Sequence, residues 1–181
     1  MEKLRIFEVN HPGSPVSSSC DHATIAHHLH PLGIRFEQWS ANQAIRAGDS
    51  QEAAIAAYQA DIDRLIAEAG YQAVDVVSLT ADHPQKDAFR QKFLAEHTHS
   101  EDEVRFFVDG QGLFSLHLGD RVYEVLCEKG DLIGVPAHTP HWFDMGPNPN
   151  FVAIRLFNNP EGWVANFTGS EIAQSFSRLD N

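Results

Sequence analysis

Residues 103–146 read EVRFFVDGQGLFSLHLGDRVYEVLCEKGDLIGVPAHTPHWFDMG, and this stretch decides the fold. Short apolar runs recur along it, and the residues between them are turn formers: Gly110, Gly112, Gly119-Asp120 and Gly130-Asp131. Short strands at regular spacing with glycine-centred turns are typical of a small antiparallel barrel or sandwich. Residues 150–157, NFVAIRLF, add one more strand. We therefore predict a mainly β fold, an antiparallel β-barrel with several peripheral helices.

The part before residue 96 mixes helices and strands. Alternating patterns predict strands at residues 4–9 and 33–39, and a short apolar run predicts a buried strand at 73–79. Helical patterns cover residues 21–33, 51–70, 83–97 and 169–176. In the 51–70 helix one apolar stripe contains Ile55, Tyr58, Ile62, Leu65 and Ile66, and Pro84 is expected in the first turn of the next helix. We expect one domain over 1–181, with the barrel core at about 70–160 and a mixed part, 1–69, packed on it.

Charge and composition exclude several classes of partner. The chain carries 25 acidic and 13 basic residues, a formal charge of -12, which disfavours nucleic acid and anionic lipid. No stretch approaches the ~20 apolar residues of a membrane helix, and the first residues do not read as a signal peptide. Two unpatterned cysteines fit a reducing compartment, with Cys127 a buried free thiol. A cytoplasmic protein is expected, and an anionic substrate would need local positive charge.

Residues 96–110, EHTHSEDEVRFFVDG, hold a candidate metal site. On an extended strand residues i and i+2 face the same way, so His97 and His99 point into one space. Glu103 and Arg105 share a face of the strand that follows. From this segment alone, a solvated acidic loop explains the residues as well as a metal site does.

Residues 130–143, GDLIGVPAHTPHWF, supply a candidate fourth ligand, His141. Three imidazoles and one carboxylate form a nitrogen and oxygen set that suits Fe, Ni, Mn, Co or Zn rather than Ca or Mg. In octahedral geometry four protein ligands leave two positions open, which is typical of catalytic sites.

The spacing of these residues resembles a known pair of motifs. His97, His99, Glu103 and Gly110 reproduce H-x-H-x3-E-x6-G, the first cupin motif, and Gly130, Pro136 and His141 reproduce most of the second. The chain departs from the pattern in three ways: it lacks a glycine six residues before His97, and it has His138 where glycine is frequent and Met145 where asparagine is usual.

Longer segments resemble the bacterial acireductone dioxygenases, a cupin family of methionine salvage. The similar segments are KFLAEHTHSEDEVRFFVDGQGLF, VLCEKGDLIGVPAHTPHWFDMG, NPEGWVANFTG, GIRFEQW and AAYQADIDRLIAEAGYQAVDVVSL. The resemblance implies a jelly-roll barrel and a reaction in which O2 cleaves 1,2-dihydroxy-5-(methylthio)pent-1-en-3-one. It implies one Fe(2+) or Ni(2+) per chain, with formate and 4-methylthio-2-oxobutanoate as products of the iron form. The nickel form would give formate, CO and 3-(methylthio)propanoate, and the family suggests a monomer.

The resemblance also assigns roles to residues. His97, His99, Glu103 and His141 would bind the metal, and Arg105 would help generate and hold the substrate dianion. Glu96 and Asp102 would support the ligands from outside, in metal uptake and conformational coupling respectively. For the methylthio tail we favour Phe93, Phe143 and Trp163, although for any one of them ordinary core packing is the more frequent explanation.

Other readings stay open at this stage. His22, His27, His28 and His30 are expected at the surface without a completing carboxylate, and His117 is expected to be isolated. His138 is expected to stabilise its turn or to support the site rather than to bind the metal. A non-catalytic metal-binding cupin and a different cupin enzyme, an isomerase or another dioxygenase, are the two rival functions.

Overall fold

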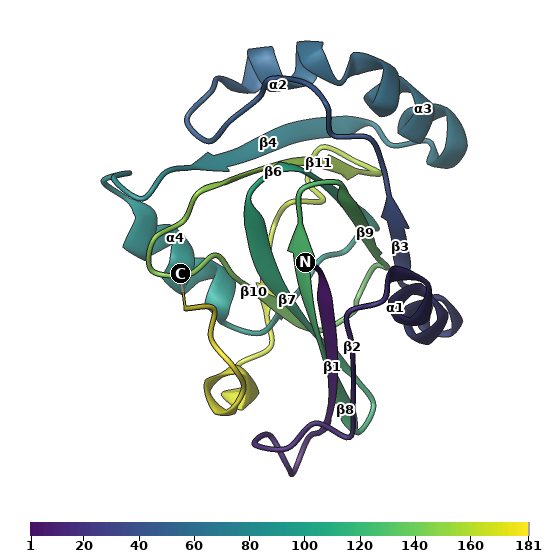
Figure 1. The fold of residues 1–181 in the computed structure, drawn as a ribbon, viewed down its shortest axis with the longest axis vertical. Coiled ribbons are helices and arrows are strands. Elements are labelled where there is room, and N and C mark those ends of the chain that lie inside the picture. Colours follow the sequence, from purple (N-terminus) through teal and green to yellow (C-terminus); the bar gives the residue numbers. More distant parts are fainter. Residues whose placement is uncertain (181) are drawn as a thin grey trace.

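Two antiparallel β-sheets form the body of the computed structural model, which describes residues 1–180 (Figure 1). The seven-stranded sheet has the order β12 (Asn166–Phe167), β5 (His97–Thr98), β10 (His141–Asp144), β7 (Gln111–Leu118), β8 (Arg121–Glu128), β1 (Lys3–Glu8) and β2 (Ser17–Ser19). The five-stranded sheet has the order β3 (Arg35–Gln38), β9 (Asp131–Val135), β6 (Glu103–Asp109), β11 (Phe151–Phe157) and β4 (Ala73–Leu79). The predicted mainly β antiparallel architecture is confirmed.

Four helices lie around the sheets, as predicted for peripheral elements. They are α1 (His22–Leu29), α2 (Gln51–Ala57), α3 (Gln59–Ala69) and α4 (Lys86–Leu94). Helices α2 and α3 cover the outer face of the five-stranded sheet, and α4 lies beside β10 (Figure 1). Short 3-10 turns follow at His30–Leu32 and Ile172–Ser175.

Strand β6 separates two apolar layers. Phe107 belongs to the barrel interior, the space between the two sheets, where it packs with Phe114 and Phe143. Val104 and Phe106 point the other way and pack in the layer beneath α2 and α3. Successive side chains of a strand alternate between faces, so a strand covered on both sides is apolar on both. The same alternation sends Glu103 and Arg105 toward the interior, as predicted from the sequence.

The predicted helix at 51–70 is two helices, and this part of the prediction is wrong. Tyr58 leaves helical geometry, with φ -114° and ψ 23°. Its ring packs edge-on against Phe106 at 5.4 Å, and its hydroxyl accepts a hydrogen bond from the backbone of Gln43 at 3.2 Å. Beyond the break Ile62 and Leu65 are buried, whereas Ile66 is 37% exposed and is not part of the buried stripe.

Three further details differ from the prediction. Strand β4 lies at the edge of its sheet and is mostly half-buried rather than buried. Helix α4 begins at Lys86, so Pro84 precedes it instead of occupying its first turn. The predicted helix at 169–176 is only the 3-10 turn Ile172–Ser175. In each case the position of the element was predicted correctly, whereas its burial or its ends were not.

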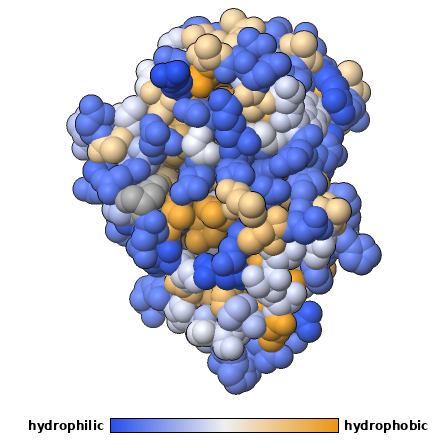
Figure 2. Space-filling view, in the orientation of Figure 1, coloured by the Kyte–Doolittle hydropathy of each residue, from blue (hydrophilic) through white to orange (hydrophobic). Residues whose placement is uncertain are grey.

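The hydrophilic character of the surface agrees with the many charged residues of the sequence. The face drawn in Figure 2 is mostly hydrophilic, with hydrophobic side chains visible mainly in a recess near its middle. Among residues 1–180 no helix has both the length and the apolar character needed to cross a membrane.

Gly112 tests the packing of the barrel interior. A Cβ atom at this position would lie 2.3 Å from the ring of Phe143, and that ring is fully buried. Gly112→Ala should therefore lower the free energy of unfolding by about 1–3 kcal/mol, because the core must move to admit the methyl group. Chemical denaturation measures this change. Gly13→Ala is the control, since its added Cβ meets nothing within 4 Å; equal stability of both variants would contradict the described packing.

Candidate metal centre

Three histidines meet at one end of the barrel interior. His97 and His141 are directly opposite each other on the paired strands β5 and β10, and His99 follows β5 in the chain. Each offers a ring nitrogen, and these three atoms lie within 4.8 Å of one another. All three side chains are buried. The sequence prediction that these histidines lie together is confirmed.

Each imidazole ring is held by a hydrogen bond on its Nδ1 side. His97 Nδ1–H donates to the carbonyl oxygen of Ala95 at 2.7 Å, and His141 Nδ1–H donates to that of Thr139 at 2.8 Å. His99 Nδ1–H donates to the carbonyl of Val164 at 3.0 Å. A carbonyl can only accept, so these bonds fix the proton on Nδ1 and leave the Nε2 lone pairs free. This is the arrangement of histidines that bind metals through Nε2.

Glu103 opens strand β6 and lies beside the three rings. Its Oε2 is 3.1 Å from His99 Nε2, without the geometry of a hydrogen bond, while its Oε1 accepts a hydrogen bond from Arg105 Nε. Burial opposes ionisation of this carboxyl, yet the charge of Arg105 holds its pKa well below the usual value. Glu103 is therefore a carboxylate.

Burial sets the protonation of the rings. It lowers the pKa of His97 to about 4 and that of His141 to about 3, since a charged imidazolium would lose its hydration there. At neutral pH these imidazoles are uncharged, which is the form that binds a metal.

The donor set fits a divalent transition metal. His99 Nε2, His141 Nε2 and Glu103 Oε2 are buried atoms with no hydrogen-bond partner in the described structure. Such atoms are costly when unsatisfied. One small cation among them would satisfy all of them at once, and a nitrogen and oxygen set of this kind suits Fe, Ni, Mn, Co or Zn.

Arg105 lies beneath this group and is 1% exposed. Its guanidinium carbon is 4.9 Å from the ring centre of Phe114 and 5.1 Å from that of Phe143. Aromatic faces stabilise a buried cation. Its Nη1 has no hydrogen-bond partner among residues 1–180, so a buried cationic donor remains available to an anion.

Sequence reasoning missed a second arginine. Arg155 on β11 is directly opposite Arg105 on β6, and it pairs with Asp75 through an Nε–Oδ1 contact of 2.8 Å. The alternation of residues 150–157 places Arg155 on a strand face, but only the pairing of β11 with β6 shows which residue it meets.

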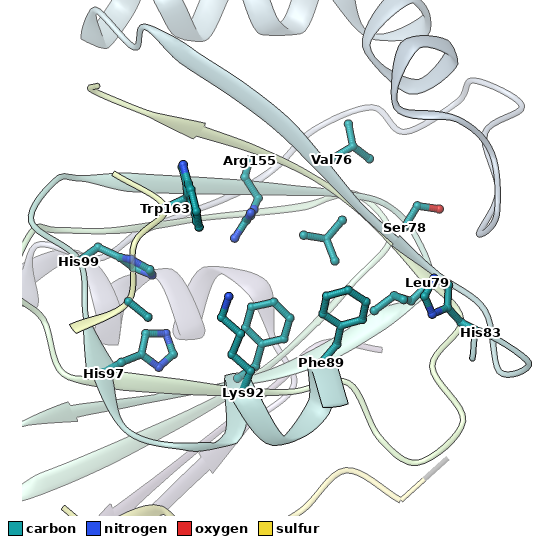
Figure 3. A pocket seen from close by; sticks show the side chains of 13 residues that line it. Val76, Ser78, Leu79, His83, Phe89, Lys92, His97, His99, Arg155 and Trp163 are labelled. Atoms are coloured by element: carbon teal, nitrogen blue, oxygen red, sulfur yellow. The ribbon is translucent and has the colours of Figure 1, made fainter. Parts of the chain in front are cut away.

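A cavity of about 290 Å³ leads to the histidines (Figure 3). Its lining combines apolar and cationic side chains with two of the site histidines: Val76, Val77, Ser78, Leu79, His83, Phe89, Lys92, Phe93, His97, His99, Arg155, Trp163 and Ala165. Phe93 and Trp163, both expected from the sequence, lie in this lining. Phe143 does not, but its ring packs edge-on against Phe93 at 6.1 Å.

Glu96 is buried beside the histidines and has two partners. His117 Nδ1–H donates to its Oε2 at 2.7 Å, and the hydroxyl of Thr168 donates to its Oε1, also at 2.7 Å. His117 was expected to be isolated, which is wrong: β10 pairs with both β7 and β5, which brings His117 of β7 to Glu96, the residue before β5.

Two short contacts join the segment of His99 to the turn before His141. The exposed Asp102 accepts a hydrogen bond from the backbone of Ala137 at 2.8 Å. The backbone N–H of His138 donates to the carbonyl of His99 at 2.8 Å, and His138 has φ +63°. The left-handed backbone accounts for the frequency of glycine at this place. His138 is exposed and outside the histidine group, so its role is in the turn.

Comparison with known proteins agrees with this geometry. The model of the ARD/ARD' family matches residues 5–165. An acireductone dioxygenase of Alcanivorax borkumensis is 67% identical over 177 residues, 98% of each chain, and one of Klebsiella pneumoniae is 60% identical over 99% of each.

A solved structure of a related protein has the same fold. The acireductone dioxygenase from Bacillus anthracis with cadmium ion in its active centre superposes with a TM-score of 0.80 at 31% identity. The match covers 92% of this chain and 98% of that one. The expected cupin-type jelly roll is thereby confirmed, and the chain belongs to the ARD/ARD' family of acireductone dioxygenases.

Proposed function

We propose that the chain holds one Fe(2+) or Ni(2+) through His97, His99, Glu103 and His141. With it the chain cleaves 1,2-dihydroxy-5-(methylthio)pent-1-en-3-one with O2, in the cytoplasm, as a step of methionine salvage. The observation that carries the proposal is the convergence of three imidazoles, each fixed through Nδ1, with the buried carboxylate of Glu103 3.1 Å from His99 Nε2. A monomer suffices, because all of these residues come from one chain.

The charges of the site match the substrate. A divalent ion with Glu103 gives about +1, and Arg105 brings the total to about +2. The acireductone dianion carries two negative charges on adjacent oxygens and would neutralise this site. A divalent metal held by His97, His99, Glu103 and His141 would supply Lewis acidity and a template for binding the substrate oxygens. The electron-rich dianion itself can reduce O2, so the residues have to bind, orient and shield it.

Arg105 is the residue to which we assign direct contact with the substrate. Its Nε is engaged by Glu103, whereas its Nη1 is buried and lacks a partner. An arginine stays protonated, so Nη1–H would donate to a substrate oxygen and favour the ionised form. The adjoining rings of Phe93, Phe114 and Phe143 exclude water from this contact.

The apolar part of the cavity would take the methylthio tail. Phe93, Phe89 and Leu79 lie in the lining of this cavity. Trp163 also lines it, with 51% of its surface exposed. The ring of Phe143 packs edge-on against that of Phe93. Lys92 adds positive charge to this cavity, whereas the charge of Arg155 is paired with Asp75. An anionic substrate needs such local positive charge in a protein of charge -12.

Glu96 and Asp102 would act on the ligands from outside. Glu96, the residue before His97, is hydrogen-bonded to His117 and Thr168. This position next to a ligand fits a role in metal uptake. Asp102 ties the ligand segment to the turn of Ala137, so a movement at Glu103 would be transmitted toward His141.

Loading the metal-free protein separately with Fe(2+) and Ni(2+) tests the function. With the acireductone and O2, the iron form should give formate and 4-methylthio-2-oxobutanoate, and the nickel form formate, CO and 3-(methylthio)propanoate. Chromatography measures the acid products and gas analysis measures CO, and the products found show whether each metal form has the proposed activity. Should neither form exceed spontaneous oxidation of the substrate, the chain would be a different cupin enzyme or a non-catalytic binding protein.

Replacement of Arg105 separates substrate activation from metal binding. Arg105→Met should lower kcat/KM by about 10²-fold, the usual effect of removing one charge-stabilising donor, while metal content stays near one per chain. Steady-state kinetics and metal analysis measure the two effects. Arg121→Met is the matched control, because Arg121 is exposed on β8. Full activity of the Arg105 variant would remove it from the mechanism.

A further inference from the structure

A second group of metal-type ligands lies outside the site described above. The group consists of Glu2, His22 and Asp131. Each offers one possible ligand atom, and these three atoms lie within 4.8 Å of one another. The sequence predicted that no carboxylate would complete a site at His22, and this is wrong. Glu2 precedes β1, His22 begins α1 and Asp131 begins β9, so only the folded chain brings them together.

This group is separate from the histidines that converge near Glu103. Strand β9 connects the two regions: its last residue, Val135, is the partner of Glu103, and its first is Asp131. Four residues of strand span about 13 Å. Gln38 of β3 is directly opposite Asp131, at the end of the sheet away from the three histidines.

Buried polar atoms point to a missing ligand. Asp131 is 0% exposed, and its Oδ2 accepts a hydrogen bond from the backbone of Glu128 at 2.8 Å. Its Oδ1 has no partner among residues 1–180, and neither has His22 Nδ1. A native structure rarely leaves a carboxylate oxygen buried in this way unless an ion or water satisfies it.

The ring of His22 is held in place for coordination. It stacks on Phe36, with ring centres 5.0 Å apart and planes at 25°. Its Nδ1 is 3.7 Å from Glu2 Oε1, which is too long for a hydrogen bond. Ligand atoms at about 2.1 Å from a shared ion are roughly 3–3.5 Å from one another. A small approach of His22 Nδ1 and Glu2 Oε1 would therefore bring both within bonding distance of one ion.

Charge also favours a cation here. Glu2 and Asp131 place two carboxyl groups in a largely buried space, and burial raises the pKa of Asp131 to about 7. The α-ammonium group of Met1 acts on Asp131 but forms its ion pair with Glu128. The amide of Gln38 reaches Glu2 Oε1 only at 3.5 Å. The His22 side chain is 29% exposed and lines an open groove, which gives an ion a path from solvent.

We propose that Glu2, His22 and Asp131 form a second divalent-cation site, with zinc-type ligands. One imidazole and two carboxylates suit Zn(2+) or Mn(2+), and a fourth position stays open to water. The ion fastens the segment before β1 to α1 and to β9, and its role is structural. The site stands whether or not the chain is a dioxygenase, because its ligands are not those of the catalytic centre.

The test uses untagged, nickel-loaded protein dialysed against Zn(2+), with nickel and zinc counted together by mass spectrometry. Wild-type protein should bind one zinc per chain in addition to its nickel, and zinc should raise its unfolding temperature. His22→Ala should weaken zinc binding at least tenfold and abolish the temperature shift. Asp131→Asn should weaken binding likewise, as a check that does not alter the helix.

His27→Ala is the matched control, since His27 is an exposed histidine of the same helix, α1. It should bind zinc as the wild type does. The proposal is overturned if His22→Ala binds zinc with unchanged affinity, if zinc uptake only replaces nickel atom for atom, or if wild-type protein takes up no additional zinc at ~1 mM. The nickel count in the same samples reports on the first site separately.

Discussion

The arrangement of the three histidines depends on three hydrogen bonds from imidazole Nδ1 atoms to backbone carbonyls. Two are local, because His97 and His141 each bond the residue two positions earlier. The third joins His99 to Val164, 65 residues away. Together they fix the tautomers and turn three Nε2 atoms toward one point. A ring free to rotate would lose this convergence, so the segment around Val164 belongs to the site although it offers no ligand of its own.

Charge compensation explains how so polar a group is tolerated inside an apolar barrel. Glu103 is balanced by Arg105, and Arg155 is balanced by Asp75. The aromatic faces of Phe114 and Phe143 replace part of the water lost around Arg105. A buried ion pair of this kind contributes little net stability, since desolvation offsets its attraction. The pair keeps Glu103 ionised, and in the proposed function it also holds a cationic donor for the anionic substrate.

Much of this site could be read from local sequence. Alternation places His97 with His99 and Glu103 with Arg105, and the structure agrees. The pairing of strands that are distant in the sequence could not be predicted from local sequence. Arg155 meets Arg105 only through the pairing of β11 with β6. His117 reaches Glu96 only because β10 pairs with both β7 and β5.

The same limit applies to the fold. Glycine-centred turns predicted the strands of residues 103–146 well, because turn chemistry is local. The break at Tyr58 depends on a contact with Phe106, nearly fifty residues later, and helix periodicity alone continues through it. His22 was assigned to the surface for the same reason, since Glu2 and Asp131 come from distant segments.

The central claim is that one metal ion is held by His97, His99, Glu103 and His141. Anomalous diffraction at the nickel absorption edge, from crystals of the nickel-loaded protein, tests it most directly. The account predicts a peak bonded to three Nε2 atoms and a Glu103 oxygen at about 2.0–2.2 Å, with every Nδ1 still on its carbonyl. A nickel peak elsewhere, or one without Glu103 among its ligands, would contradict it.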